Sequence, residues 1–436
     1  MKIPKLIILD MDGLMFDSES ISKHFYLQVA LEHGYVVPEE LYNSMLGGNK
    51  ERNKSILINH FGESYPYKQI SEETGKLCLD YYNHHGIGIK KGLIELLEYA
   101  KMKHIYVAVA SSSNKDVIER NLKMANVNHY IDYVISGDQV EHSKPHPEIF
   151  LNSCVYFGIL PQEAIVLEDS KNGILAARNA NIPVICVPDL IYHSRDIFNL
   201  TYATVPSLDC VIDLIEKQVK LAIFDMDGLM FDTERQCIQP LIKANRDFGY
   251  EMSEEIAYQL IGTSGANAKE ILLNHFGKDY PYQQIDEEFE QLLLNTIKTE
   301  GLSIKEGLIK LLNHLQDLNI KCVVAASSHT DLIRTYLNLS NITQYFDKII
   351  GGDQVAFTKP NPDLFIKACE VCHVKQEDAI VFEDSKNGIL AANEAHIPVI
   401  CIPDIIMHDQ SILNKTLAFM PSLSRVHLNS KNGGKQ

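Results

Sequence analysis

Short apolar runs of strand length alternate along the chain with segments of helical spacing. Helical patterns begin at Gly92 and at Asn172, between such runs. Continuous apolar runs are typical of parallel strands that helices cover on both faces. The pattern therefore predicts an α/β fold with a Rossmann-like, doubly wound parallel sheet. In the first half of the chain, the predicted strands are 5–9, 105–110, 133–136, 164–168 and 182–187.

The segment between the first two predicted strands departs from this alternation. Residues 18–89 show helical patterns and no clear strand. Such a stretch is too long for an ordinary loop in a compact domain. We therefore predict a helical cap at about 18–89, inserted after the first strand, and a matching cap at about 233–304.

The whole pattern occurs twice. DMDGLMFDSE at 10–19 recurs as DMDGLMFDTE at 225–234. EDSKNGILAA begins at Glu168 and again at Glu383. Both repeats have an offset of 215 residues. Each copy far exceeds the roughly 20–50 residues of a solenoid repeat, so a domain has been duplicated. We predict a first unit at 1–216, a second at 217–423, and a flexible polar tail at 424–436.

Composition narrows the class of protein. Of 436 residues 45% are hydrophobic, yet no apolar run approaches the ~20 residues that span a bilayer, so no membrane association is expected. The net charge of −17 disfavours nucleic-acid polymers as partners, although a metal and a lysine can still attract a small phosphate ester. Nine scattered cysteines fit a reducing cytoplasm. Cys369 and Cys372 form a CxxC without a match in the first half, and we interpret them as packed thiols.

Polar side chains lie at the ends of several predicted strands. Asp10 and Asp12 come directly after the first, and carboxylates this close repel each other unless a cation or a shared proton stabilises them. Strand ends of a doubly wound sheet meet at one rim, so we expect a shared site. Acids at this rim supply oxygen ligands for Mg²⁺, and a lysine and hydroxyl groups can bind a phosphate. A carboxylate can then attack phosphorus and form an aspartyl-phosphate. The other polar residues at such ends are Ser111, Lys144, Glu168 and Asp169.

Four motifs resemble those of the haloacid dehalogenase-like superfamily, in particular its β-phosphoglucomutase-like phosphatases. They are DMDGLMFDSE, VAVASSS, GDQVEHSKPHPEIF and IVLEDSKNGILAA, and together they extend over essentially the whole of each unit. The resemblance implies a Mg²⁺-dependent phosphatase with a helical cap, an aspartate nucleophile and a small phosphorylated metabolite as substrate.

The resemblance also implies a role for each polar residue of the first unit. Asp10 would be the nucleophile and a Mg²⁺ ligand. Asp12 would protonate the leaving alcohol and later activate water, with its backbone carbonyl facing the metal. Asp169 would complete the metal site, with Glu168 beside it as a supporting ligand. The phosphoryl oxygens would be held by Ser111 and Lys144.

The second unit has the same residues with one departure. Ser111 corresponds to Ala326, and the nearest hydroxyl is that of the next residue, Ser327. We therefore predict Ser327 as the phosphate ligand there, and a second unit that is weakened but active. The implied counterparts are Asp225 as nucleophile and metal ligand, Asp227 as acid/base and metal ligand, Asp384 as metal ligand with Glu383 beside it, and Lys359 as phosphate ligand.

Alternatives remain open. We favour hydrolysis of a sugar phosphate or nucleoside monophosphate over β-phosphoglucomutase-type transfer, because the mutase pattern has a histidine where this chain has Ser22 and Cys237. Alternatively, the second unit is a weakened regulatory or binding copy. In the cap, Lys50 lies where related enzymes often carry a basic residue that contacts the substrate. The second unit has Gly265 at the corresponding position, so the substrates of the two units can differ. The sequence leaves the oligomeric state open.

Overall fold

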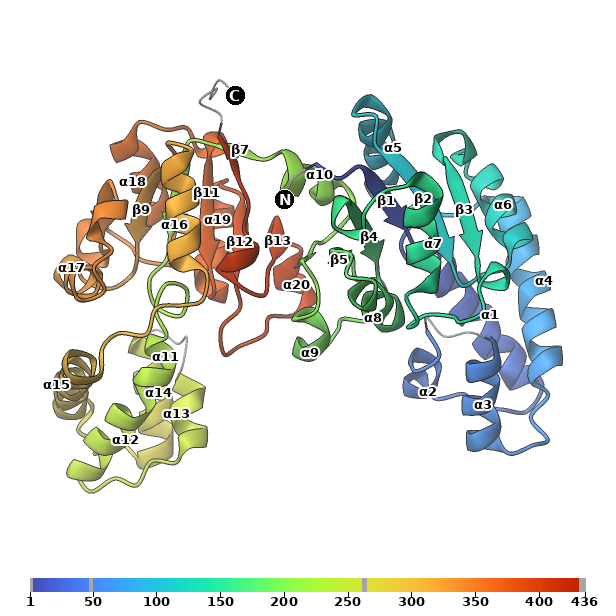
Figure 1. The fold of residues 1–436 in the computed structure, drawn as a ribbon. Helices are drawn as coiled ribbons and strands as arrows, with labels where there is room; N and C mark the ends of the chain where they lie inside the picture. Colours follow the sequence, from blue (N-terminus) through green and yellow to red (C-terminus); the bar gives the residue numbers. More distant parts are fainter. Residues whose placement is uncertain (1–2, 47–49, 261–264, 431–436) are drawn as a thin grey trace. The chain divides into compact units, whose positions relative to one another are not determined.

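A computed structural model describes residues 3–46, 50–260 and 265–430 (Figure 1). The chain divides into two compact units. One contains the chain up to Lys217 together with Asp409–Pro421, and the other contains Gln218–His408 and the chain from Ser422 onward. No helix in the described ranges is both long and apolar enough to cross a membrane.

The first unit is built on a parallel sheet whose strands have the order β6–β5–β4–β1–β2–β3. Leu9 at the end of β1 is level with Val109 of β2 and Leu167 of β4. The residues that follow these three strands therefore emerge side by side at one edge. The strands are β1 (Leu6–Leu9), β2 (Tyr106–Ser111), β3 (Tyr133–Ser136), β4 (Ala164–Glu168), β5 (Val184–Cys186) and β6 (Ala203–Thr204).

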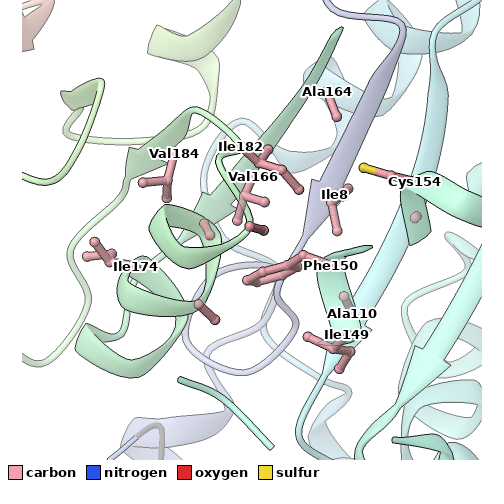
Figure 2. Packing of buried hydrophobic residues seen from close by; sticks show 14 of the residues in the cluster. Ile8, Ala110, Ile149, Phe150, Cys154, Ala164, Val166, Ile174, Ile182 and Val184 are labelled. Carbon is pink, nitrogen blue, oxygen red and sulfur yellow. The ribbon is translucent and has the colours of Figure 1, made fainter. Parts of the chain in front are cut away.

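Helices cover this sheet through an apolar core. Phe150 is fully buried in one cluster with Ile8, Val166 and Ile174, which come from two strands and another helix (Figure 2). Burying such a side chain contributes about 1.5–3 kcal/mol. The helices of this core are α5 (Leu93–Met102), α6 (Lys115–Met124), α7 (Glu148–Phe157), α8 (Lys171–Asn179), α9 (Arg195–Phe198) and α10 (Asp209–Glu216), and the unit also contains α20 (Gln410–Leu413) and β13 (Ala418–Phe419).

The predicted cap of the first unit is helical and has its own core. Tyr26, Leu57 and Ile70 belong to its buried apolar cluster, and the Tyr26 and Tyr65 hydroxyls lie 2.8 Å apart. A bridge between Phe16 and Ile89 joins the chain entering the cap to the chain leaving it. The cap helices are α1 (Ser18–Glu32), α2 (Glu39–Asn43), α3 (Lys50–Phe61) and α4 (Tyr67–His85).

The second unit repeats this parallel arrangement in the order β10–β9–β8–β11–β12. The strands are β8 (Leu221–Phe224), β9 (Lys321–Ala325), β10 (Lys348–Ile350), β11 (Ala379–Glu383) and β12 (Val399–Cys401). The core helices are α16 (Leu308–Asp317), α17 (Thr330–Leu339), α18 (Asp363–Cys372) and α19 (Lys386–Glu394).

The cap of the second unit begins differently from the first. The single helix α1 corresponds to two helices that meet at Cys237. Pro240, near the start of the second of them, has no N–H to donate to the carbonyl four residues earlier, which accounts for the break. The cap helices are α11 (Thr233–Gln236), α12 (Ile238–Asp247), α13 (Glu254–Leu260), α14 (Gly265–Phe276) and α15 (Tyr282–Glu300).

The structure confirms the predicted fold class, two α/β parallel-sheet cores with inserted helical caps. In the segment 424–436, predicted as a flexible tail, Val426 and Leu428 are buried and β14 (Asn429–Ser430) pairs with β7 (Gln218–Val219), whereas 431–436 lie outside the described residues. Cys369 and Cys372 are buried, unbridged thiols of α18, as the sequence predicted.

Candidate active site

Lys144 lies among the acids at the strand ends of the first unit. Its Nζ donates to Asp10 Oδ1 at 2.5 Å, to Glu168 Oε1 at 2.8 Å and to the Ala110 carbonyl at 3.1 Å. Burial lowers the pKa of Lys144, but the charges of Asp10 and Glu168 outweigh it and hold that pKa above its usual value. The ammonium group therefore stays charged and fixes the orientation of Asp10.

Asp12 is held by hydroxyl groups from the core and the cap. Ser18 Oγ, at the start of the cap, donates to Asp12 Oδ1 at 2.7 Å, and Ser113 Oγ donates to Oδ2 at 2.9 Å. Ser111 Oγ lies 3.4 Å from the same Oδ2 and accepts the Ser113 N–H at 3.0 Å. Asp12 is therefore bound by hydroxyl groups, whereas Asp10 is bound by the ammonium group of Lys144.

The first unit offers a set of carboxylates that fits a divalent cation. Oxygens of Asp10, Glu168 and Asp169 lie within 4.8 Å of one another. Within the described residues, Asp169 Oδ1 is buried without a hydrogen-bond partner, which a cation would supply. Burial, followed by the charges of Glu19 and Glu168, raises the pKa of Asp169 far above its ordinary range. Burial likewise raises the pKa of Asp10 to about 7, although Lys144 opposes it.

Two neighbours of Asp169, Gly13 and His193, contact it closely. Gly13 has φ +84°, and an added Cβ would overlap Asp169 Oδ2, so the glycine of the DxDG motif allows the close approach. A ring nitrogen of His193 lies 2.5 Å from the Asp169 carbonyl. Sequence reasoning missed His193, although its recurrence as His408 at the common offset was a signal.

The second unit repeats the cluster. Lys359 Nζ donates to Asp225, and to Glu383 Oε1 at 2.6 Å. Asp225, Glu383 and Asp384 form the matching group of carboxylates, and within the described residues Asp384 Oδ1 is buried without a partner. Burial raises the pKa of Asp225 to about 7, with Lys359 opposing it. His408 approaches the Asp384 carbonyl at 2.5 Å.

Two hydroxyl groups contact Asp227, and neither belongs to Ser327. Thr233 Oγ1 donates to Asp227 Oδ1 at 2.9 Å and Ser328 Oγ donates to Oδ2 at 3.0 Å. Ser327, the predicted phosphate ligand, has an exposed side chain. Ala326 is buried at the end of the strand where Ser111 lies in the first unit. Three hydroxyl groups therefore lie around Asp12 in the first unit, and two lie around Asp227 in the second.

A second group of charges lies where each cap joins its core, and sequence reasoning missed it. Lys90 pairs with Asp189 in the first unit. In the second, Lys305 pairs with Asp404 at 2.5 Å, and Arg235 also reaches Asp404 at 2.8 Å. These lysines and aspartates recur at the common offset, whereas Arg235 replaces a serine. The cap–core junction is therefore more heavily paired in the second unit.

A cavity of about 510 Å³ lies between the cap and the core of the first unit. Asp10, Asp12 and Lys144 line it on the core side, so it can hold a small ester at the acids. The predicted cap contact Lys50 and its counterpart Gly265 lie outside the residues whose side chains the structure describes. Cap residues that line the cavity include Ser22, Tyr26, Tyr42, Thr74 and Tyr82.

A family model described as haloacid dehalogenase-like hydrolase matches residues 7–187 and again 222–402. The chain belongs to this family. Each match includes the lysine and the acids clustered at the strand ends of its unit, namely Asp10, Asp12, Lys144, Glu168 and Asp169 in the first and Asp225, Asp227, Lys359, Glu383 and Asp384 in the second. The predictions of the family and of a hydrolytic enzyme are confirmed.

The chain is also similar to individual proteins. The chain is 31% identical over 182 residues to "Phosphorylated carbohydrates phosphatase" of Thermotoga maritima, covering 40% of this chain and 81% of that protein. It is 27% identical over 209 residues to "Validoxylamine A 7'-phosphate phosphatase" of Streptomyces hygroscopicus subsp. limoneus, covering 48% and 95%. The solved β-phosphoglucomutase of Clostridium difficile matches at 20% identity and a TM-score of 0.41, covering 47% and 92%.

Proposed function

We propose that each unit hydrolyses a small organic phosphate monoester, such as a phosphorylated sugar, through an aspartyl-phosphate. The observation that carries the proposal is the lysine that joins Asp10 to Glu168 in the lining of a cavity, beside an Asp169 oxygen that has no hydrogen-bond partner among the described residues. This arrangement combines a nucleophile, a fixed positive charge and a cation site. Its recurrence around Lys359 supports the same chemistry in the second unit.

Asp10 and Asp225 are the proposed nucleophiles. Lys144 and Lys359 stabilise their charged forms and offer positive charge to the phosphoryl oxygens as bonds to phosphorus change. Attack by an Asp10 carboxylate oxygen on phosphorus breaks the bond to the alcohol oxygen. The phosphoryl group is then carried by the aspartate until water releases it as inorganic phosphate.

Asp12 and Asp227 are the proposed acid/base groups. Each is buried or half-buried, and hydroxyls on both of its oxygens fix its orientation. Burial raises the pKa of Asp227, which favours the protonated carboxyl that can donate its proton to the leaving alcohol. After the alcohol departs, the same carboxylate accepts a proton from the attacking water.

The residues fit Mg²⁺, and Asp10 with Asp169, or Asp225 with Asp384, would hold it. The set consists of hard oxygen donors, and one oxygen in each unit lacks another partner among the described residues. Bound there, the ion supplies positive charge that screens the acids from an anionic substrate. Glu168 and Glu383 contact the lysines, so their proposed role is to hold these lysines in place.

The test is release of inorganic phosphate from a panel of phosphorylated sugars and nucleoside monophosphates. We expect the full chain to release phosphate with Mg²⁺ present, and the Asp10→Asn plus Asp225→Asn variant to release none. Phosphate release by the double variant would contradict the proposed nucleophiles. Conversion of β-glucose 1-phosphate into glucose 6-phosphate, with little free phosphate, would favour the mutase alternative.

A further inference from the structure

Arg120 of α6 is a positive charge in the first unit that the proposed chemistry does not use. Its side chain is half-buried and lines the cavity that also contains Asp10 and Asp12. Within the described residues, no carboxylate forms an ion pair with it. Both its Nε and its Nη2 instead donate to Asn121 Oδ1, at 3.2 and 3.0 Å. Because a guanidinium carries five N–H donors, most of them remain available to a ligand.

The cap helix α4 faces this arginine across the cavity. Ser71, Gly75, Cys78 and Tyr82 line the cavity and follow a helical spacing, so they share one face of α4. The charge of Arg120 acts on Cys78, whose thiol pKa burial raises to about 11. Tyr82 is within electrostatic reach of both Asp12 and Arg120. The arginine and the acids therefore line one space, together with several hydroxyl and phenol groups.

The second unit differs at each of these positions. The counterpart of Arg120 is Thr335, whose hydroxyl donates to the Asp331 carbonyl of its own helix at 2.8 Å. The counterpart of Asn121 is Tyr336, which is buried and packs edge-on against Phe231. The counterpart of Gly75 is Glu290 of α15, whose charge acts on Tyr336, as does that of Asp227. A cation has been lost and an acid gained near the same place.

We propose that Arg120 binds a second anionic group, a carboxylate or a second phosphate, on the alcohol portion of the first unit's substrate. In the second unit, Thr335 and Glu290 disfavour such a group, so its substrate has an uncharged or cationic alcohol portion. This inference rests on the proposed function, because it assumes that the phosphate lies at Asp10 and Lys144. The charge is well placed for recognition because Asn121, itself buried, holds the guanidinium without neutralising it.

The test uses the full chain with Asp225→Asn, so that turnover of para-nitrophenyl phosphate reports on the first unit. The probes are ω-phosphonocarboxylates and ω-hydroxyalkylphosphonates of matched length, used as inhibitors with Mg²⁺ present. We expect a carboxylate of suitable length to inhibit about 10–100-fold more strongly than its hydroxyl partner. A bisphosphonate series shows which anion is preferred.

The ratio of the two inhibition constants should fall to near one in Arg120→Ala and be partly kept in Arg120→Lys. Lys123→Ala is the matched control, since it removes the same charge from an exposed position of α6. Equal weakening of both inhibitors by Arg120→Ala, or an unchanged ratio, would overturn the proposal. In the chain with Asp10→Asn, which reports on the second unit, we expect a ratio at or below one, and Thr335→Arg with Glu290→Gly should raise it.

Calorimetric titration with the same inhibitors separates this inference from the proposed function. It measures the ratio without turnover, so it still tests Arg120 if no ester is hydrolysed. Absence of hydrolysis together with an Arg120-dependent ratio would refute the hydrolytic mechanism alone. Hydrolysis that depends on Asp10, with no Arg120-dependent ratio, would refute the role of Arg120 alone.

Discussion

In the first unit, Lys144 joins two acids beside a cavity that Arg120 also lines. In the second, Lys359 joins the two corresponding acids, but Thr335 replaces the arginine, and the cap carries Glu290 where the first unit has Gly75. The shared part consists of acids at the ends of neighbouring strands and of a lysine from the loop that follows β3 or β10. The differing part lies on a core helix and a cap helix, α6 and α4 in the first unit, that line the cavity. The comparison indicates that duplication kept the groups that we propose for phosphoryl transfer and changed those that we propose to face the alcohol portion of the substrate.

Removal of the metal should have the largest effect, and an equal one in both units. Chelation by EDTA should abolish phosphate release, because the clustered carboxylates would then repel an anionic ester. Added Mg²⁺ should restore activity and raise the melting temperature. A chain that turns over fully in EDTA would refute the cation site in both units.

Removal of the central lysine should destabilise each unit. Lys144→Ala leaves Asp10 and Glu168 buried without their partner, which should reduce the free energy of unfolding by about 3–5 kcal/mol at neutral pH. Lys359→Ala should act similarly on the second unit. Urea unfolding measures both, with Lys123→Ala as an exposed control expected within about 0.5 kcal/mol of the parent. A loss below about 1 kcal/mol would show that the lysine is not structurally required.

Restoration of the missing hydroxyl should have a smaller effect. Ala326→Ser in the chain with Asp10→Asn should raise kcat/KM of the second unit, since a well-placed donor contributes about 10²–10³ in rate. We expect a gain of tenfold or less, because Ser328 and Thr233 already contact Asp227. A second unit that does not respond would place the difference between the units in their caps.

The smallest expected effect concerns pH. The folded pKa values of Asp10 and Asp225, about 7, exceed their ordinary value of 3.8, so without metal the folded state binds more protons between these limits. Stability contributed by these acids therefore falls as pH rises from about 4 to 7. Because Mg²⁺ binds the deprotonated acids, its gain in melting temperature should be larger at pH 8 than at pH 5. An equal gain at both pH values would contradict this account.

The sequence predicted the core better than the surroundings of the site. β3 and β4 begin and end where the sequence predicted, at Tyr133–Ser136 and Ala164–Glu168. The apolar residues of β4 are all buried, as is typical of a strand that helices cover on both faces. Asp10 and Glu168 lie close together because β1 and β4 are neighbours whose ends are level in the sheet. Lys144 follows β3 only after a loop, since β3 ends at Ser136, so its contacts with both acids also depend on that loop and on the long lysine side chain.

Other contacts depend on tertiary packing that periodicity does not reveal. Ser113 lies closer to Asp12 than Ser111 does, and in the second unit Ser328, rather than Ser327, reaches the acid. Which hydroxyl of a serine run turns inward depends on the loop backbone after the strand. Arg120 is the sixth residue of α6, in its second turn, and the cavity that it lines exists only where the cap packs over the core.

The central claim is that each unit has a complete site of its own and recognises a different substrate. The most direct test compares the two single variants, Asp10→Asn and Asp225→Asn, on one panel of phosphate esters. The account predicts that Asp10→Asn and Asp225→Asn each retain activity, with different substrate profiles that together reproduce the parent. In particular, Asp225→Asn should keep the activity on esters with a second anionic group, and Asp10→Asn should lose it. Loss of all activity in either single variant, or identical profiles in both, would contradict the account.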